Sequence, residues 1–164
     1  MAIKKEQKGF ALLIAVIFMT VMLTFGLSLG SIGFKQQILA SGAIASQYAF
    51  YAADAALECA LYADQQLNSF AYVADLSAPA PRMACDAASN PIFANVTSHT
   101  DTQWVIESHL SLDNGTHCAK VVIWKPAAPS GKTYIFSQGY DVSCTAAFDS
   151  NTGRFVSRGL DTHY

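Results

Sequence analysis

The chain is short of charged side chains, which make up 13% of its 164 residues, while hydrophobic residues make up 52%. Soluble domains usually carry about a quarter charged residues. An excess of positive charge is also missing, because 10 Lys and Arg stand against 12 Asp and Glu. This balance excludes a basic nucleic-acid-binding protein, and the hydrophobic content excludes a disordered chain. The length predicts a single domain.

Several motifs that mark enzymes and metal sites are absent as well. The sequence has no phosphate-binding loop, no dinucleotide-binding fingerprint, no Cys-x-x-Cys and no His-x-x-x-His. Asp54 and Glu58 lie four residues apart, and we expect them to be solvated or to pair with charges on other molecules rather than to act as catalytic acids. We therefore predict no catalytic residue, no metal ligand and no cofactor.

Charge is absent altogether from one hydrophobic run, residues 10–34, which ends at Lys35. As a helix the run would be roughly 37 Å long, enough to cross a hydrocarbon core of ~30 Å with some tilt. The apolar region of a secretory signal peptide is only ~7–15 residues long, so we predict one membrane span, with a buried core helix as the alternative. Three lysines precede the run and place the N-terminus in the cytoplasm and the rest of the chain outside: Lys4, Lys5 and Lys8.

Gly26 and Gly30 lie four residues apart within this run. Small residues at that spacing let helix backbones approach closely in a membrane. Both are therefore candidates for helix packing, although glycine is also simply tolerated in membrane spans.

Proline is missing before Pro79, and the alanine-rich residues 36–68 favour helix. The membrane helix should therefore continue to about Asn68 and reach nearly 90 Å, too long for a compact monomer and suited to a spine that carries a head. One stripe recurs at spacings of three and four, and we expect it to be half-buried against the head: Ile44, Tyr48, Tyr51, Ala55, Cys59 and Tyr62.

The rest of the chain predicts a small sheet. A loop with three of the five prolines leads to strands expected over residues 102–110, 118–125, 132–140 and 154–164, with a hairpin turn at Asp113-Asn114-Gly115. These four strands predict an antiparallel meander whose one face the helix covers. The predicted fold class is α+β, a long N-terminal helix with a transmembrane first half packed on a small antiparallel sheet.

All four cysteines follow the predicted span, on the side where disulfides form. Cys59 lies at the end of the helix and Cys85 in the loop that leaves it, while Cys118 and Cys144 flank the second and third strands. Of the three possible connectivities we favour Cys59–Cys85 with Cys118–Cys144. Each disulfide would stabilise the head by roughly 2–4 kcal/mol.

The junction Lys8-Gly9-Phe10, with a short basic leader before it and an apolar run after it, resembles the N-terminus of type IV prepilins. The resemblance implies that a prepilin peptidase cuts between Gly9 and Phe10 and that Phe10 is then N-methylated. It also implies four segments: a leader at 1–9, a transmembrane half-helix at 10–34, an extracytoplasmic half-helix at 35–68, and a loop with a sheet head at 69–164.

Ile14 departs from that family. Most pilins carry glutamate at the fifth mature position, which is thought to pair with the amino terminus of a neighbouring subunit, and an isoleucine cannot make this pair. The chain is therefore most similar to minor pilins of the PilX type and to the type II secretion pseudopilin found at a filament tip. The strings AFYAADAALECALYAD, SQGYDVSC and RFVSRGLDTHY also look like pilin-related proteins of small-genome bacterial lineages.

The resemblance implies a structural subunit of a type IV pilus-like filament, acting in assembly, priming or at the tip. Its implied partners are other pilin subunits, the prepilin peptidase, the inner-membrane assembly machinery and the lipid bilayer. It would sit in the cytoplasmic membrane with a single span before it enters a pilus or pseudopilus. The alternative is a single-span, membrane-anchored binding protein or adhesin outside any filament.

Overall fold

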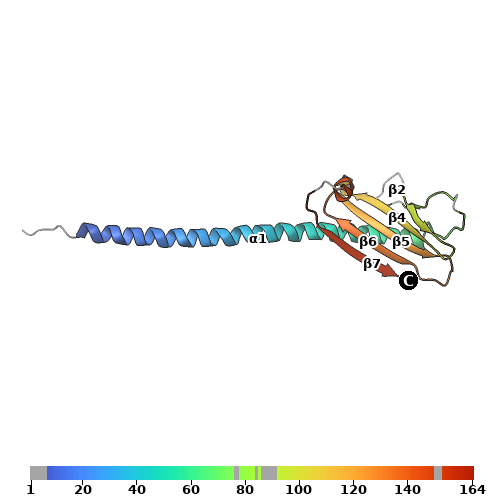
Figure 1. The fold of residues 1–164 in the computed structure, drawn as a ribbon, viewed down its shortest axis with the longest axis horizontal. Helices are drawn as coiled ribbons and strands as arrows, with labels where there is room; N and C mark the ends of the chain where they lie inside the picture. Colours follow the sequence, from blue (N-terminus) through green and yellow to red (C-terminus); the bar gives the residue numbers. More distant parts are fainter. Residues whose placement is uncertain (1–6, 76–77, 84, 86–91, 150–152) are drawn as a thin grey trace, which may run out of the picture. The chain divides into compact units, whose positions relative to one another are not determined.

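The computed structural model describes residues 7–75, 78–83, 85, 92–149 and 153–164. The chain divides into two units between Gly42 and Ala43. Helix α1 (Gln7–Gln65) forms the described part of the first unit and continues into the second, which holds the sheet (Figure 1). The α+β fold predicted from the sequence is confirmed, and the second unit begins within the predicted extracytoplasmic half-helix.

Helix α1 ends close to the predicted position. Its last residue is Gln65, and Asn68 adopts the left-handed conformation with φ of 50°. The Ser69 N–H then donates to the Ala63 carbonyl at 2.9 Å, which satisfies one of the carbonyls that the end of a helix leaves without a partner. Asn tolerates the left-handed region better than other non-glycine residues, so the helix stops here without a proline.

A five-stranded antiparallel sheet fills most of the second unit, in the order β3-β4-β5-β6-β7. A turn with positive φ at Asp113, Asn114 and Gly115 joins β4 to β5, where the sequence predicted a hairpin. A separate pair is formed by β1 (Arg82–Met83) and β2 (Ile92–Phe93). The strands of the main sheet are β3 (Asn95–His99), β4 (Gln103–Leu112), β5 (His117–Pro126), β6 (Tyr134–Tyr140) and β7 (Ser157–His163).

The prediction of four strands was incomplete. Strand β3 was missed because it lies at the edge of the sheet with its side chains mostly exposed, so its sequence NVTSH shows no apolar alternation. Helix α2 (Cys144–Phe148) was missed because one turn is too short for helical periodicity. Its start is fixed locally, since the Ser143 side chain accepts a hydrogen bond from the Ala146 N–H.

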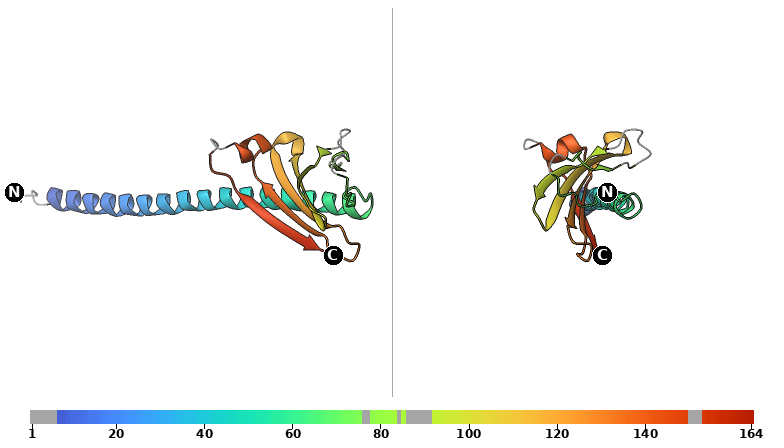
Figure 2. Two further views of the ribbon diagram at one scale, coloured as in Figure 1. Left: turned by 45° about the vertical axis from the view of Figure 1, so that its right-hand side comes forward. Right: turned by 90° about the vertical axis from the view of Figure 1, so that its right-hand side faces the viewer.

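The face of α1 that packs on the sheet consists of alanine, and the predicted tyrosine stripe was wrong. The exposed fractions of Tyr51 and Tyr62 are 65% and 57%, and Ile44 and Tyr48 are also more than half exposed. The buried face is rotated away from these side chains, and Figure 2 shows this part of α1 along one face of the sheet. Its members are Ala49, Ala52, Ala53, Ala56, Ala60 and Ala63.

Close approach of the two backbones explains the alanine face. A Cβ placed on Gly139 of β6 would overlap the Ala49 carbonyl and the Ala53 N–H of α1. Beside this contact the buried Ser137 hydroxyl donates to the Ala53 carbonyl at 2.8 Å. Tyrosine rings cannot fit where the helix and the strand almost touch, so they lie on faces of α1 that are turned away from this contact.

The Gly139→Ala substitution tests this contact. We expect it to lower the free energy of unfolding by about 3 kcal/mol, because the new methyl group meets main-chain atoms that cannot rotate away. Urea denaturation of the full chain in detergent micelles, followed by tryptophan fluorescence, measures the change. The matched control is Gly153→Ala, whose added Cβ would meet nothing within 4 Å. Equal stability of the two variants would contradict the close-packing account.

Candidate functional site

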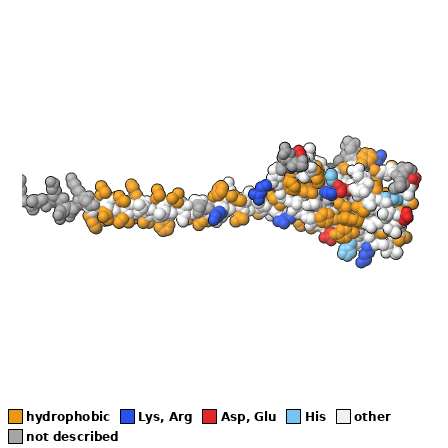
Figure 3. Space-filling model, viewed as in Figure 1, with side chains coloured by type: hydrophobic (Ala, Val, Ile, Leu, Met, Phe, Trp, Pro, Cys, Tyr) orange, Lys and Arg blue, Asp and Glu red, His pale blue; other side chains and the backbone are white. Residues whose placement is uncertain are grey.

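The apolar part of α1 is the first candidate site. It is long and apolar enough to cross a membrane, and Figure 3 shows hydrophobic side chains on it. Hydroxyl groups in and just after the run donate to carbonyls three residues earlier, at 2.8 Å for Thr20, 2.8 Å for Thr24 and 2.9 Å for Ser41. Each of these hydroxyl donors is therefore satisfied within the helix, as a helix in lipid would require.

The residues predicted to act at the N-terminus lie in or before this helix. Lys4 and Lys5 fall outside the described residues, while Lys8 and Gly9 belong to α1. Phe10 and Ile14 are 69% and 40% exposed. A Cβ added to Gly26 or Gly30 would meet nothing within 4 Å in the described part of the chain, so their role in helix packing stays a prediction.

Residues 26–30 read Gly-Leu-Ser-Leu-Gly, so the Gly-x-Ser-x-Gly spacing of α/β-hydrolase nucleophiles is present in the sequence. That chemistry needs the serine on a sharp turn between a strand and a helix. Here the motif lies inside continuous helix, far from any turn. The spacing therefore reflects small residues in an apolar helix rather than a nucleophile.

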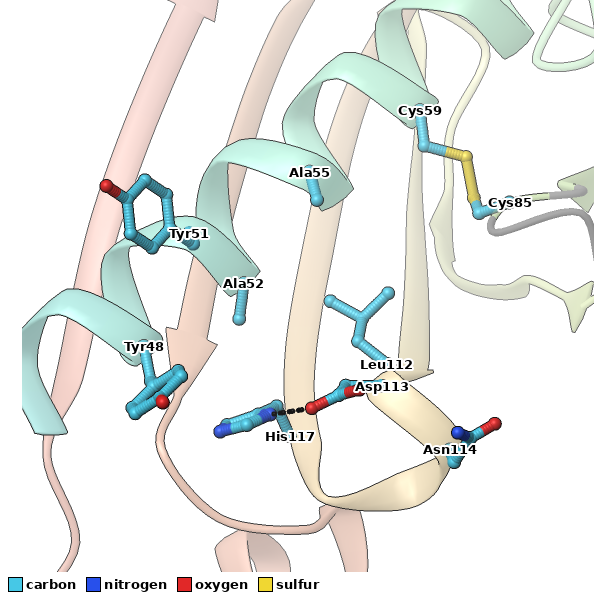
Figure 4. A pocket seen from close by; sticks show the side chains of 10 residues that line it. All are labelled: Tyr48, Tyr51, Ala52, Ala55, Cys59, Cys85, Leu112, Asp113, Asn114 and His117. Atoms are coloured by element: carbon cyan, nitrogen blue, oxygen red, sulfur yellow. Dashed lines mark ion pairs between the residues drawn. A yellow bond between two sulfur atoms is a disulfide. The ribbon is translucent and has the colours of Figure 1, made fainter.

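A groove runs beside α1 within the second unit, with a volume of about 590 Å³. Figure 4 shows that α1 forms one wall and the turn between β4 and β5 forms the other. The disulfide Cys59–Cys85 closes one end. The remaining lining residues are Tyr48, Tyr51, Ala52, Ala55, Leu112, Asp113, Asn114 and His117.

The polar groups of the groove hold the turn. His117 Nδ1 lies 3.4 Å from Asp113 Oδ2, and the His117 ring stacks on Tyr48 at 4.9 Å between ring centres (Figure 4). The Thr116 hydroxyl is 2.9 Å from the same nitrogen, Nδ1. A catalytic relay uses the two imidazole nitrogens for different partners, whereas both contacts here are to one nitrogen. The contacts of His117 with Asp113, Thr116 and the Tyr48 ring instead hold the turn against the helix.

Tyr48, Tyr51 and Tyr62, with Ile44, form an exposed surface on α1 that we call the tyrosine face. The acidic pair considered from the sequence lies near it, with Asp54 half-buried and Glu58 exposed. A groove with an aromatic wall and an exposed helix face can bind another polypeptide, because aromatic side chains are enriched in protein interfaces.

A buried ion pair anchors the C-terminal end of α1, and sequence reasoning did not find it. The Asp64 side chain is 1% exposed and accepts hydrogen bonds from Lys125 Nζ at 2.6 and 2.8 Å. It also accepts one from the Tyr164 hydroxyl. Burial and the hydrogen bond to Asp64 raise the pKa of Tyr164 above its usual value. The sequence did indicate which face Lys125 occupies. Side chains alternate along a strand, and Lys125 lies two and four residues after Ile123 and Val121, which face the helix.

The disulfides join Cys59 to Cys85 and Cys118 to Cys144, with Cα–Cα distances of 5.8 and 4.8 Å. This is the pairing that the sequence favoured. The first bond ties the loop after α1 to that helix, and the second ties α2 to β5.

Among the described residues, no three His, Cys, Asp or Glu side chains gather where they could hold a metal ion.

A second polar cluster lies on the sheet face opposite α1. Glu107 binds Lys120 at 2.8 Å and His109 at 3.1 Å, and the His109 ring stacks on Phe148 of α2. Burial raises the pKa of Glu107, but the hydrogen bonds and charges of Lys120 and His109 outweigh this and lower it below its usual value. The cluster therefore holds an ionised carboxylate that helps seat α2.

No protein-family model matches this chain, and neither a curated protein nor a solved structure is significantly similar to it. The function is therefore inferred from the chain's own helix, faces and junction.

The Lys125→Met substitution tests the buried ion pair. Loss of the ammonium leaves the Asp64 charge buried without its cation, so we expect the free energy of unfolding to fall by about 3–5 kcal/mol. Thermal or urea unfolding of the full chain in micelles measures the change. The matched control is Lys120→Met, which breaks the partly exposed pair with Glu107 and should cost at most about 1 kcal/mol. An equal loss in both variants would show that Asp64 is not an anchor.

Proposed function

We propose that this chain is a structural subunit of a type IV pilus-like filament, present as a minor pilin or pseudopilin and active in assembly, priming or at the tip. The observation that carries the proposal is an apolar run that begins directly after Lys8-Gly9, at Phe10, and lies within one uninterrupted helix. A prepilin peptidase would cut after Gly9, and the mature helix would remain in the cytoplasmic membrane, N-terminus inside, until it enters the filament.

The tyrosine face supports the same proposal. A membrane anchor alone needs no exposed aromatic residues on the part of α1 that packs on the sheet, yet Tyr51 and Tyr62 are each more than half exposed there. In a filament, helices of neighbouring subunits pack side by side and cover such faces. Burial of one aromatic side chain contributes ~2–3 kcal/mol, so these residues can stabilise the contact between subunits.

Ile14 sets the expected role within the filament. An incoming amino terminus needs a negative partner in a medium of low dielectric, where an unpaired charge costs several kcal/mol. A subunit with Ile14 can supply the amino group but cannot receive one. A homopolymer would repeat this cost at every step, so the chain fits one end or sparse positions beside a major pilin.

The proposed processing is tested at the N-terminus of the mature protein. N-terminal sequencing and mass spectrometry should find a chain that begins with N-methylated Phe10 in a host that has the peptidase. Gly9→Leu should block cleavage, because a bulky side chain does not fit where an extended backbone enters the protease. The control Lys8→Gln keeps the glycine and should still be cut. A mature chain that retains Met1 in such a host would exclude the pilin assignment.

The proposed minor role is tested by quantitative mass spectrometry of sheared filaments. We expect this chain to be a small fraction of the subunits, and Ile14→Glu to raise its incorporation severalfold because it restores a partner for the amino group. The control Ile17→Glu adds the same charge one turn later and should not help. If this chain is the dominant subunit, or if Ile14→Glu changes nothing, the missing glutamate does not limit assembly.

The alternative is a membrane-anchored binding protein or adhesin outside any filament. The same helix would then serve only as an anchor, and Phe10 would carry no methyl group. The processing experiment therefore separates the two functions.

A further inference from the structure

The face of the sheet opposite α1 carries an uncovered aromatic surface. The strand register places side chains of four strands in rows across this face. One row is Val105, Trp124, Tyr134 and His163, and the next is Glu107, Val122, Phe136 and Asp161. We call the five apolar members the aromatic platform: Val105, Val122, Trp124, Tyr134 and Phe136.

Among the described residues, helix α2 covers the other end of this face. The disulfide Cys118–Cys144 holds α2 there, where Phe148 stacks on His109 and contacts the edge of Tyr140. The platform lies beyond α2 along the same strands, and Figure 3 shows hydrophobic side chains gathered at that position on the sheet. Its rings are close together, with 5.1 Å between the centres of Trp124 and Tyr134.

The platform is flat because a glycine of β7, Gly159, leaves space for the neighbouring Phe136 ring. Gly159 has no side chain, and a Cβ added there would lie 3.1 Å from the Phe136 ring, so this ring lies over the strand. Neighbouring strands are ~4.8 Å apart and residues of one face ~7 Å apart along a strand, which makes the two rows ~14 Å by ~7 Å. This is a shallow surface that fits a flat, elongated ligand.

Its area is too small for a stable protein dimer. Tyr134 is 36% exposed and the other four side chains are half-buried. Aromatic side chains offer ~150–250 Å² each when fully exposed, so the platform presents at most ~400 Å². A stable protein interface needs ~800 Å² on each partner. The platform therefore matches a small ligand better than a second copy of this chain.

The charges around the platform disfavour an acidic ligand. Glu107 and Lys120 neutralise each other at 2.8 Å. The Asp161 carboxylate borders the rings on the β7 side, where Phe136 and Asp161 are paired in the strand register. Nucleic acid, acidic sugars and anionic lipid headgroups would all meet this carboxylate. Asp161, His163 and Gln138 can instead exchange hydrogen bonds with hydroxyl groups.

We propose that the aromatic platform binds a neutral oligosaccharide. A sugar ring has an apolar face of C–H groups, which stacks on Trp124, Tyr134 and Phe136, and a rim of hydroxyl groups, which reaches the polar side chains at the border. Recognition combines an apolar surface with a few placed polar groups, as small-molecule sites do. The proposal does not depend on filament assembly, so it stands or fails separately from the proposed function.

The two tryptophans allow a direct test by NMR of the indole N–H signals. The ¹⁵N-labelled full chain, in micelles of a detergent without a sugar headgroup, is titrated separately with cellotriose, chitotriose and maltotriose. At least one sugar should shift the Trp124 signal in a saturable way. Trp104 is an internal control, because it is 5% exposed and its indole donates to the Phe70 carbonyl at 3.1 Å.

Matched tyrosine variants complete the test. Tyr134→Ala should weaken binding about tenfold, as loss of a central aromatic contact does, while Tyr51→Ala, on α1, should leave it unchanged. Three results would overturn the proposal: no sugar shifts the Trp124 signal, Tyr134→Ala and Tyr51→Ala behave alike, or vesicles of phosphatidylglycerol shift Trp124 while the sugars do not.

Discussion

The contact between α1 and β6 is the constraint on which the rest of this molecule depends. Gly139 brings the strand against the helix backbone at Ala49 and Ala53, and every fully buried hydrophobic residue in the described part of α1 is an alanine. The larger side chains, including Tyr51 and Tyr62, are left on faces that the sheet does not cover. One steric condition therefore both holds α1 on the sheet and leaves an apolar surface of the helix exposed.

The sequence alone predicted the long helix, the antiparallel sheet, the Asp113–Gly115 turn and the disulfide pairs, because hydrophobic run length, turn residues and cysteine order are local signals. The sequence did not show which face of α1 is buried. Both the tyrosine residues and the alanine residues recur with the spacing of a helix, and only the tertiary contact at Gly139 decides which of the two sets meets the sheet. The Asp64–Lys125 pair joins residues 61 positions apart, and the aromatic platform depends on strand register across four strands. The alternation along β5 indicates which face Lys125 occupies, but neither its partner Asp64 nor the grouping of the platform residues can be read from a local stretch of sequence.

The second unit presents two different surfaces. The tyrosine face lies on α1, beside a groove whose polar groups are occupied in holding the turn. The aromatic platform lies on the opposite face of the sheet, where Cys118–Cys144 confines α2 to one end. A subunit that packs through its helix would keep the far side of its sheet available. The two proposals therefore concern different faces, and substitutions on one face test one proposal without touching the other.

The central claim is that another pilin-like subunit covers the tyrosine face. Replacing Tyr51 by a photo-crosslinking phenylalanine derivative in the native host, with Phe93 as an exposed control position, tests this claim most directly. Illumination of cells that carry filaments should yield an adduct from position 51 with a second subunit whose first residue is N-methylated, and none from position 93. No adduct at position 51, or the same adducts from both positions, would contradict the account.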